Sequence, residues 1–275
     1  MLRLRTRAMV VAVCFGLLSA IGLHQNAGAE ESRLDLIKQR GKLLAGVRYD
    51  LPPYGYTDAN GQPVGFCVEV AKYFAAKLGV GIEYVQVTAK SRIPLIVNGT
   101  IDADIGVTTP TVEREQVIDF SVPYLSEGVT LMVRKDSGIK AFADAKVVAV
   151  TQGSINGDRF LKVNPAAKIV YFQDYPQAAL AVANKKADAL ALPRENLMSF
   201  AKGMPELGVL NDDFYREYDA IGLKQNDSKW RNWVNVTLQE MWCKGEFQKL
   251  YEKFVGAPPH FYLWSPTGLE EGIKC

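Results

Sequence analysis

Short apolar runs rich in β-branched residues alternate along the chain with segments whose apolar positions recur at helical spacing. The run at 43–49 is typical of a buried strand, whereas Phe66, Val70 and Phe74 repeat every four residues and predict a helix over 66–78. Further strands are predicted at 82–87, 102–108, 129–135, 146–151, 168–172, 188–192 and 218–224, and further helices at 92–99, from 156, at 175–186, from 194 and throughout 228–254. This alternation indicates an α/β fold with parallel sheets wrapped by helices.

The strand–helix series occurs twice, which predicts two α/β lobes. We expect residues 30–128 plus 224–275 to form lobe 1, and residues 129–223 to form lobe 2. Strands near 129–134 and 219–224 are expected to join the lobes and to act as hinges.

The first 29 residues have the pattern of a signal peptide. Three arginines lie within the first seven residues, an apolar run follows from 8 to 23, and small residues at 27–29 fit a cleavage site. A retained membrane anchor is the alternative, but the apolar run is shorter than a typical membrane span. We therefore expect an exported protein.

Removal of this leader changes the formal net charge from +2 to −1, because it carries three arginines and no acidic residue. The remaining chain then has no net positive charge to attract nucleic acid. With 48% hydrophobic residues, it can bury a large core, and its length suits two domains or one large one.

Three cysteines remain after the leader: Cys67, Cys243 and Cys275. An odd number in an exported chain suggests one disulfide and one buried thiol. Cys67 lies on the apolar face of the helix predicted over 66–78, so we expect a disulfide between Cys243 and Cys275.

Several kinds of catalytic site are disfavoured by the composition. His260 is the only histidine after the leader, which argues against a histidine-based nucleophilic site and against a histidine-rich metal site. The chain has no C-x-x-C and no P-loop, and the serine of "GSING" at 153–157 is not placed as in a nucleophile elbow. We therefore expect a protein that is not an enzyme and needs no cofactor.

Cationic and hydroxyl side chains follow several predicted strands, where open α/β sheets bind ligands. Arg48 ends the first strand, Arg92 begins a helix, and Thr108 and Thr109 end the strand that precedes Arg114. Arginine binds a carboxylate through two charge-assisted hydrogen bonds. The three arginines therefore predict a small ligand with more than one negative group.

Other residues extend this predicted site, and some have plainer explanations. Gly153 and Ser154 join a strand to a helix in lobe 2, where backbone amides can face an anion. Tyr54 either forms an aromatic wall or packs in the core. Arg114 could instead pair with a neighbouring glutamate, and Arg48 could cap the edge of the sheet.

The segments "GKLLAGVRYDLPPYGYTDANGQPVGFCVEVAKYFAAKLG" and "RIPLIVNGTIDADIGVTTPTVEREQVIDFSVPY" resemble family 3 of the bacterial extracellular solute-binding proteins, and "KVVAVTQGS" and "YDAIGLK" continue the likeness. The resemblance implies a two-lobed type II periplasmic-binding-protein fold with two hinge strands. It also implies a periplasmic, monomeric receptor that closes on its ligand and delivers it to the membrane permease of an ABC importer.

The resemblance also implies roles for single residues. Arg114 and Thr109 would hold the α-carboxylate of an amino acid, Gly153–Ser154 would close over it, and Tyr54 would pack on the ligand. Arg48 and Arg92 match positions that meet the side-chain carboxylate in glutamate/aspartate receptors, which favours an acidic amino acid.

One position departs from the family pattern. Members that bind α-amino acids usually carry an aspartate for the ammonium group where this chain has Pro193. Either Glu195 or Asp50 replaces it, or the ligand is a dicarboxylate or keto acid without an amine, which Arg194 would suit. A prephenate/arogenate dehydratase-like enzyme on the same fold is a further alternative.

Overall fold

The computed structural model describes residues 31–261, 263 and 275. Among them, Ser32–Cys275 form one compact unit. The predicted leader, residues 1–29, lies outside the described residues. No described helix is both long and apolar enough to cross a membrane.

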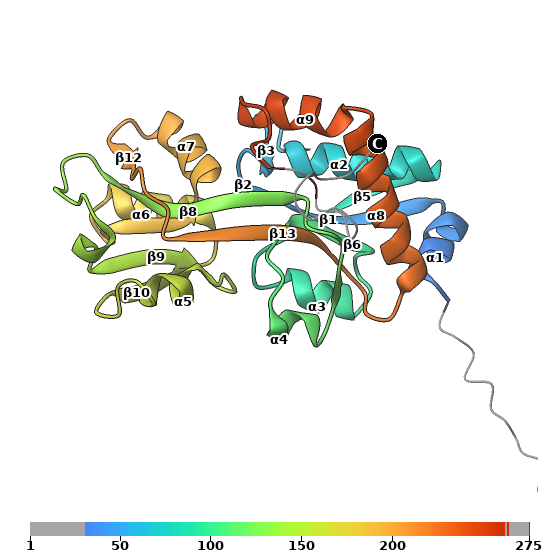
Figure 1. The fold of residues 1–275 in the computed structure, drawn as a ribbon, viewed down its shortest axis with the longest axis horizontal. Coiled ribbons are helices and arrows are strands. Elements are labelled where there is room, and N and C mark those ends of the chain that lie inside the picture. The colour runs from blue at the N-terminus through green and yellow to red at the C-terminus, as the bar shows by residue number, and fades with distance from the viewer. Residues whose placement is uncertain (1–30, 262, 264–274) are drawn as a thin grey trace, which may run out of the picture. The chain divides into compact units, whose positions relative to one another are not determined.

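The first strand–helix series forms a parallel sheet in the order β5–β1–β6. β1 (Lys42–Arg48) pairs in parallel with β5 (Gly81–Val87) and with β6 (Ala103–Thr108). α2 (Phe66–Leu78) packs against all three strands, and α3 (Arg92–Val97) packs against β6 from the opposite side (Figure 1). The predicted bounds of α2, residues 66–78, are confirmed. The side chains of Phe66, Val70 and Phe74, on which the prediction rested, are all fully buried.

The second series forms another parallel arrangement. β9 (Val147–Thr151) lies between β10 (Lys168–Phe172) and β11 (Ala189–Pro193) and is parallel to both. The helices of this series are α5 (Asn156–Leu161), α6 (Tyr175–Ala183) and α7 (Arg194–Gly203).

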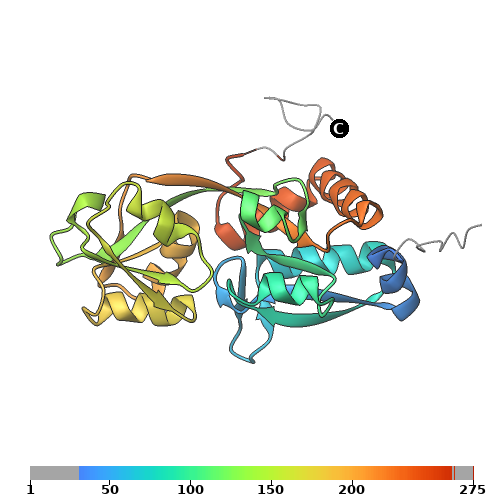
Figure 2. The same cartoon turned by 90° about the horizontal axis from the view of Figure 1, so that it is seen from below.

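Two long strands join these parts. β8 (Leu125–Arg134) and β13 (Tyr215–Leu223) are antiparallel to each other; β8 also pairs with β11, and β13 also pairs with β6. A continuous sheet therefore runs in the order β10–β9–β11–β8–β13–β6–β1–β5, with the two helix-covered parts at its ends (Figures 1 and 2). This is the two-lobed type II fold. We call the parts lobe 1 and lobe 2 as defined above, and β8 and β13 the hinge strands.

Two segments differ from the sequence prediction. The Pro- and Gly-rich stretch after β1, where no strand is predicted above, holds a small antiparallel sheet of β2 (Asp50–Leu51), β3 (Gly55–Thr57) and β4 (Pro63–Val64). The tail is not one helix: α8 (Ser228–Cys243) and α9 (Glu246–Val255) are separated at Gly245, whose φ of 71° is left-handed. Glycine adopts this conformation without a Cβ clash, so the chain turns there.

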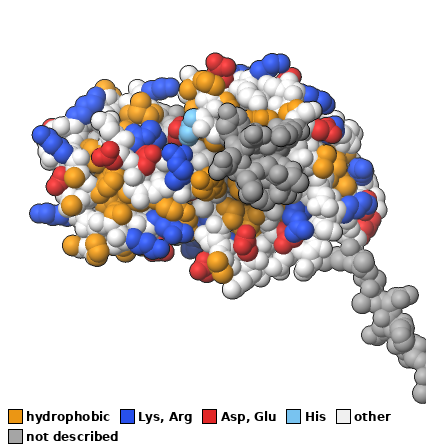
Figure 3. Space-filling view, viewed as in Figure 1, with side chains coloured by type: hydrophobic (Ala, Val, Ile, Leu, Met, Phe, Trp, Pro, Cys, Tyr) orange, Lys and Arg blue, Asp and Glu red, His pale blue; other side chains and the backbone are white. Residues whose placement is uncertain are grey.

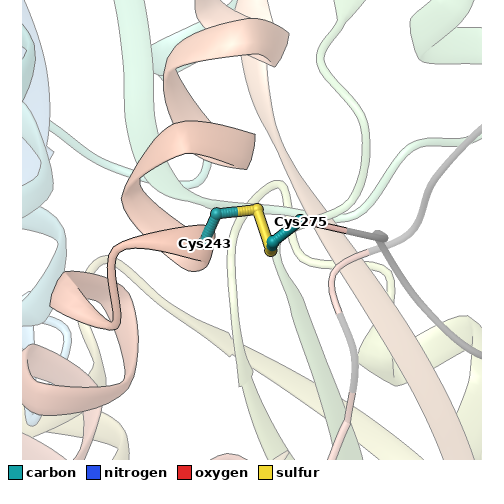
Figure 4. The surroundings of a disulfide bond; sticks show 2 residues. All are labelled: Cys243 and Cys275. Atoms are coloured by element: carbon teal, nitrogen blue, oxygen red, sulfur yellow. A yellow bond between two sulfur atoms is a disulfide. The ribbon is translucent and has the colours of Figure 1, made fainter.

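The remaining elements are short. They are α1 (Arg33–Arg40), α4 (Val112–Glu115), β7 (Asp119–Phe120), a 3-10 helix (Phe142–Asp144) and β12 (Leu207–Val209). Cys243, at the end of α8, forms a disulfide with Cys275 (Figure 4), and Cys67 is free and buried. On the face drawn in Figure 3, basic and acidic side chains are interspersed.

Candidate functional site

A cavity lies where the carboxyl ends of β1 and β6 in lobe 1 face the ends of β9 and β11 in lobe 2. About 350 Å³ of empty space lies between its walls, part of it open to solvent. The polar groups in its lining come from both lobes and from a hinge strand, and they include Arg48, Arg92, Thr109, Arg114, Ser154 and Glu217. The three arginines proposed from the sequence thus line one cavity.

Arg114 links the two lobes. It lies in α4, directly after β6, and its side chain is 9% exposed. Its Nη1 donates to the carbonyl oxygen of Thr109 at 2.7 Å, and its Nη2 donates to the carbonyl oxygen of Gly153 in lobe 2 at 2.9 Å. Burial, followed by the charge of Arg92, lowers the pKa of Arg114 to about 10, so it stays protonated near neutral pH.

The three hydroxyls before Arg114 have different environments. Thr109 lines the cavity, and its Oγ1 lies 3.3 Å from Oε2 of Glu217 and 3.0 Å from Oδ1 of Asp219. Thr108 donates to Asp104 and does not line the cavity. Thr111 accepts from the backbone N–H of Arg114 at 3.3 Å and caps α4.

Arg48 is already paired with a carboxylate. Its Nε and Nη2 each donate to one oxygen of Asp50 at 2.8 Å, and its guanidinium lies 5.1 Å from the ring centre of Tyr175 in lobe 2. Burial disfavours the charge of Arg48, but Asp50 outweighs that effect and the pKa rises. The charge that Arg48 presents to a ligand is therefore largely balanced by Asp50.

Arg92 has spare donor capacity. Its Nη1 donates to the carbonyl oxygen of Val107 at 2.7 Å, whereas its Nε is buried without a hydrogen-bond partner. Val107 itself has a φ of 62°, an unusual value for a β-branched residue. Such strain is common at functional sites. It lies here at the end of β6, in the cavity wall.

Gly153 and Ser154 form the turn between β9 and α5. Ser154 lines the cavity, and the carbonyl of Gly153 accepts the hydrogen bond from Arg114. Gly153 has a φ of +83°, and a Cβ at this position would lie 2.6 Å from the carbonyl oxygen of Ala89 in lobe 1. The backbones of the two lobes therefore lie close together at this glycine.

Four of the nine predicted ligand-binding residues are absent from the cavity lining: Thr108, Gly153, Arg194 and Tyr54. Arg194 donates to the carbonyl oxygens of Leu210 and Asn211 at 2.7 Å each and pairs with Asp213, so its guanidinium is engaged elsewhere. Tyr54 is fully buried, and its hydroxyl is hydrogen-bonded to Glu127. Tyr54 thus packs in the core, the alternative that the sequence had left open.

Sequence reasoning missed the acidic residues of the hinge strands. Glu127 on β8 lies opposite Glu217 on β13, and Asp219 follows on the same face of β13. One oxygen from each of the three lies within 4.8 Å of the others. Burial raises the pKa of Glu127 and Glu217 well above the ordinary glutamate value. The available signal was the period-two spacing of Glu217 and Asp219 within an apolar strand.

The cavity also has an apolar wall. Among the described residues, its apolar lining consists of Leu51, Val107, Ile155, Tyr175, Leu192 and Pro193. Asn156 and Asn196 add amide groups, and each has a buried side-chain oxygen without a hydrogen-bond partner. The lining thus offers a small molecule both charged or polar groups and apolar surface.

Known proteins share this architecture. The sequence model of the bacterial extracellular solute-binding proteins, family 3, matches residues 43–257. A glutamine-binding protein of Geobacillus stearothermophilus is 38% identical over 202 residues, covering 70% of this chain and 77% of the relative.

Two solved structures are also similar. A mutant of ArgBP from T. maritima matches with a TM-score of 0.77 and 33% identity, covering 82% of this chain and all of the other. An ancestral amino acid-binding protein, a precursor of cyclohexadienyl dehydratase, matches with a TM-score of 0.76 and 34% identity over the same shares of the two chains. This chain belongs to family 3 of the bacterial extracellular solute-binding proteins.

Proposed function

We propose that the chain is a periplasmic receptor that closes its two lobes on an acidic amino acid and delivers it to the permease of an ABC importer. The observation that carries this proposal is the placement of the buried residues Arg48, Arg92 and Arg114 around one cavity between the lobes. Guanidinium groups bind carboxylates strongly, because each hydrogen bond is charge-assisted.

Arg114 is the group that would hold the α-carboxylate. It bridges to Gly153 across the lobes, so a carboxylate bound to Arg114 meets lobe 2 only when the lobes are closed. Such a ligand binds the closed form better than the open form and shifts the hinge equilibrium towards closure. The closed form would then be recognised by the permease.

A neutral amide side chain, as in glutamine, is the second candidate. The bidentate pair of Arg48 with Asp50 supports it, because the pair leaves one fewer positive charge for a side-chain carboxylate. The glutamine-binding relative agrees with this possibility. The wild-type affinities for L-glutamate and L-glutamine separate the two candidates, and Asp50→Asn should strengthen L-glutamate binding relative to L-glutamine binding because it frees Arg48.

Calorimetric titration of the purified protein with L-glutamate, L-aspartate, L-glutamine and L-arginine tests the proposal. We expect micromolar or tighter binding of an acidic or amide amino acid, and Arg114→Ala should weaken it about 100-fold or more, because a buried carboxylate then loses its charge-assisted donors. Arg194→Ala is the matched control and should bind as the wild type does. Binding of L-arginine alone, or consumption of prephenate, would contradict the proposal.

A further inference from the structure

The wall of the cavity has a proline where an acceptor for an ammonium group is expected. Pro193 ends β11 and lines the cavity, and its ring offers no atom that accepts a hydrogen bond from an amine. A receptor for an α-amino acid still has to satisfy the ligand's ammonium group, because a buried charge without a partner costs several kcal/mol. Another acceptor must therefore serve, and a carboxylate is the kind that also balances the charge of the ammonium group.

Most nearby carboxylates are unsuitable. Both oxygens of Asp50 accept from Arg48, and Asp50 is absent from the cavity lining. Asp104 accepts from Thr108, and neither Asp104 nor Glu195 lines the cavity. Among the described residues, Glu217 is the carboxylate that reaches the cavity wall.

Glu217 is also close to the group that would hold the carboxylate. Its Oε2 lies 3.3 Å from Oγ1 of Thr109, and the carbonyl of the same Thr109 accepts from Arg114 at 2.7 Å. The carboxylate and ammonium of an α-amino acid are attached to one carbon atom, so their binding groups must be neighbours. Arg114 and Glu217 meet this condition by sharing Thr109.

We propose that Glu217, carried by hinge strand β13, binds the α-ammonium group of the ligand in place of an acidic residue at position 193; this rests on the proposed amino-acid binding. The ammonium then lies beside the carboxyl groups of Glu127 and Asp219, where Glu127 Oε2 and Asp219 Oδ2 are buried without hydrogen-bond partners. A cation at this place relieves the crowding of three acidic groups. The residue that binds the amine thus lies on a strand that joins the two lobes.

The experiment compares amino acids with their amine-free counterparts. Calorimetry measures the binding of L-glutamate against glutarate and of L-glutamine against glutaramate, for the wild type and for Glu217→Gln. We expect the wild type to prefer the amine-bearing partner by about 10- to 100-fold, the range of a charge-assisted hydrogen bond, and Glu217→Gln to reduce this preference to less than about threefold. Affinity for the amine-free partner should change little.

Glu252→Gln is the control of the same chemistry, because Glu252 is exposed on α9 and does not line the cavity. Its preference for the amine should stay within about threefold of the wild-type value. If Glu217→Gln does not fold, Glu217→Asp replaces it, and its shorter side chain should lower the preference for the amine while glutarate still binds.

Two outcomes would overturn the inference and leave the proposed receptor function standing. One is equal wild-type affinity for L-glutamate and glutarate; the other is an unchanged preference in both Glu217 variants. If the wild type bound none of these four compounds, the proposed function itself would fall and the inference with it.

Discussion

Neighbouring residues with similar side chains have separate roles in this protein. Thr108 is the last residue of β6 and Thr109 follows it, yet their hydroxyl groups have different partners. Thr108 meets the buried Asp104, whereas Thr109 meets the cavity and the carboxyl groups of β13. Thr111 caps α4 and fixes the start of the turn that carries Arg114. The three hydroxyl groups of this segment thus have three roles: Thr108 binds a buried carboxyl group, Thr109 faces the cavity, and Thr111 caps α4.

The buried Asp219 predicts a pH-dependent stability. Burial raises its pKa to about 6, against the opposing effects of Thr109, Arg92 and Arg114. Because the folded pKa exceeds the ordinary aspartate value of about 4, the folded state favours the protonated form. The contribution of Asp219 to the free energy of unfolding is therefore fully present below pH ~4, and it is lost as the pH rises through about 6.

Thermal unfolding of the ligand-free protein from pH 4 to 8 measures this effect. Asp219→Asn should make the pH dependence of the melting temperature shallower, because the group that titrates is gone. Asp212→Asn serves as the control, since Asp212 is exposed, and should follow the wild-type curve. Identical curves for all three proteins would refute the prediction.

Among the elements, the turn between β9 and α5 brings the backbones of the two lobes close together. Its Gly153 faces the carbonyl of Ala89 across the lobes and accepts the hydrogen bond from Arg114. The turn therefore brings the lobe 2 backbone close to lobe 1 and also contacts Arg114, the residue proposed to bind the ligand's carboxylate. The resemblance implied closure at this glycine, and the contact with Ala89 supplies a steric reason for glycine at that place.

Gly153→Ala should weaken binding of the amino acid identified by calorimetry about tenfold or more. The added Cβ would lie 2.6 Å from the Ala89 carbonyl oxygen, which pushes the lobes apart in the closed form. Gly138→Ala is a close control: Gly138 has a φ of +73°, and a Cβ there meets nothing within 4 Å. Both variants carry the cost of a left-handed alanine, about 1 kcal/mol, but Gly138→Ala should bind as the wild type does. Equal affinities would show that the lobes tolerate the extra atom.

At the scale of the whole molecule, the C-terminal helices return to lobe 1 and are tied to the end of the chain. α8 contacts α1 and α9, and α9 also contacts α2. The disulfide between Cys243 and Cys275 spans 32 residues of sequence. It limits the freedom of this segment in the unfolded chain, which is the main way in which a disulfide stabilises a fold.

Reduction of this disulfide should lower the free energy of unfolding by roughly 3–4 kcal/mol, according to the loop-entropy relation. Denaturant unfolding with and without a phosphine reductant measures the change. The double variant Cys243→Ser with Cys275→Ser should already have the lower stability and should not respond to the reductant. A wild-type midpoint that is insensitive to reduction would contradict the prediction.

The sequence by itself determined the α/β class, the bounds of α2 and a cluster of arginines at strand ends. These follow from local rules: apolar periodicity reports which face of an element is buried, and the carboxyl ends of parallel strands gather loop residues at one edge of a sheet. The division of the tail at Gly245 was missed, because the apolar pattern continues across it while one backbone angle changes.

Only the tertiary structure decided which charges face the cavity. Asp50 pairs with Arg48, Arg194 is held by Asp213, and Glu217 reaches the site from a strand more than one hundred residues beyond Arg114. Such pairings depend on the packing of distant segments and on burial, which strengthens interactions between charges. Local sequence rules fix which face of an element is apolar, but the partner of a buried charge is fixed only when the chain has folded.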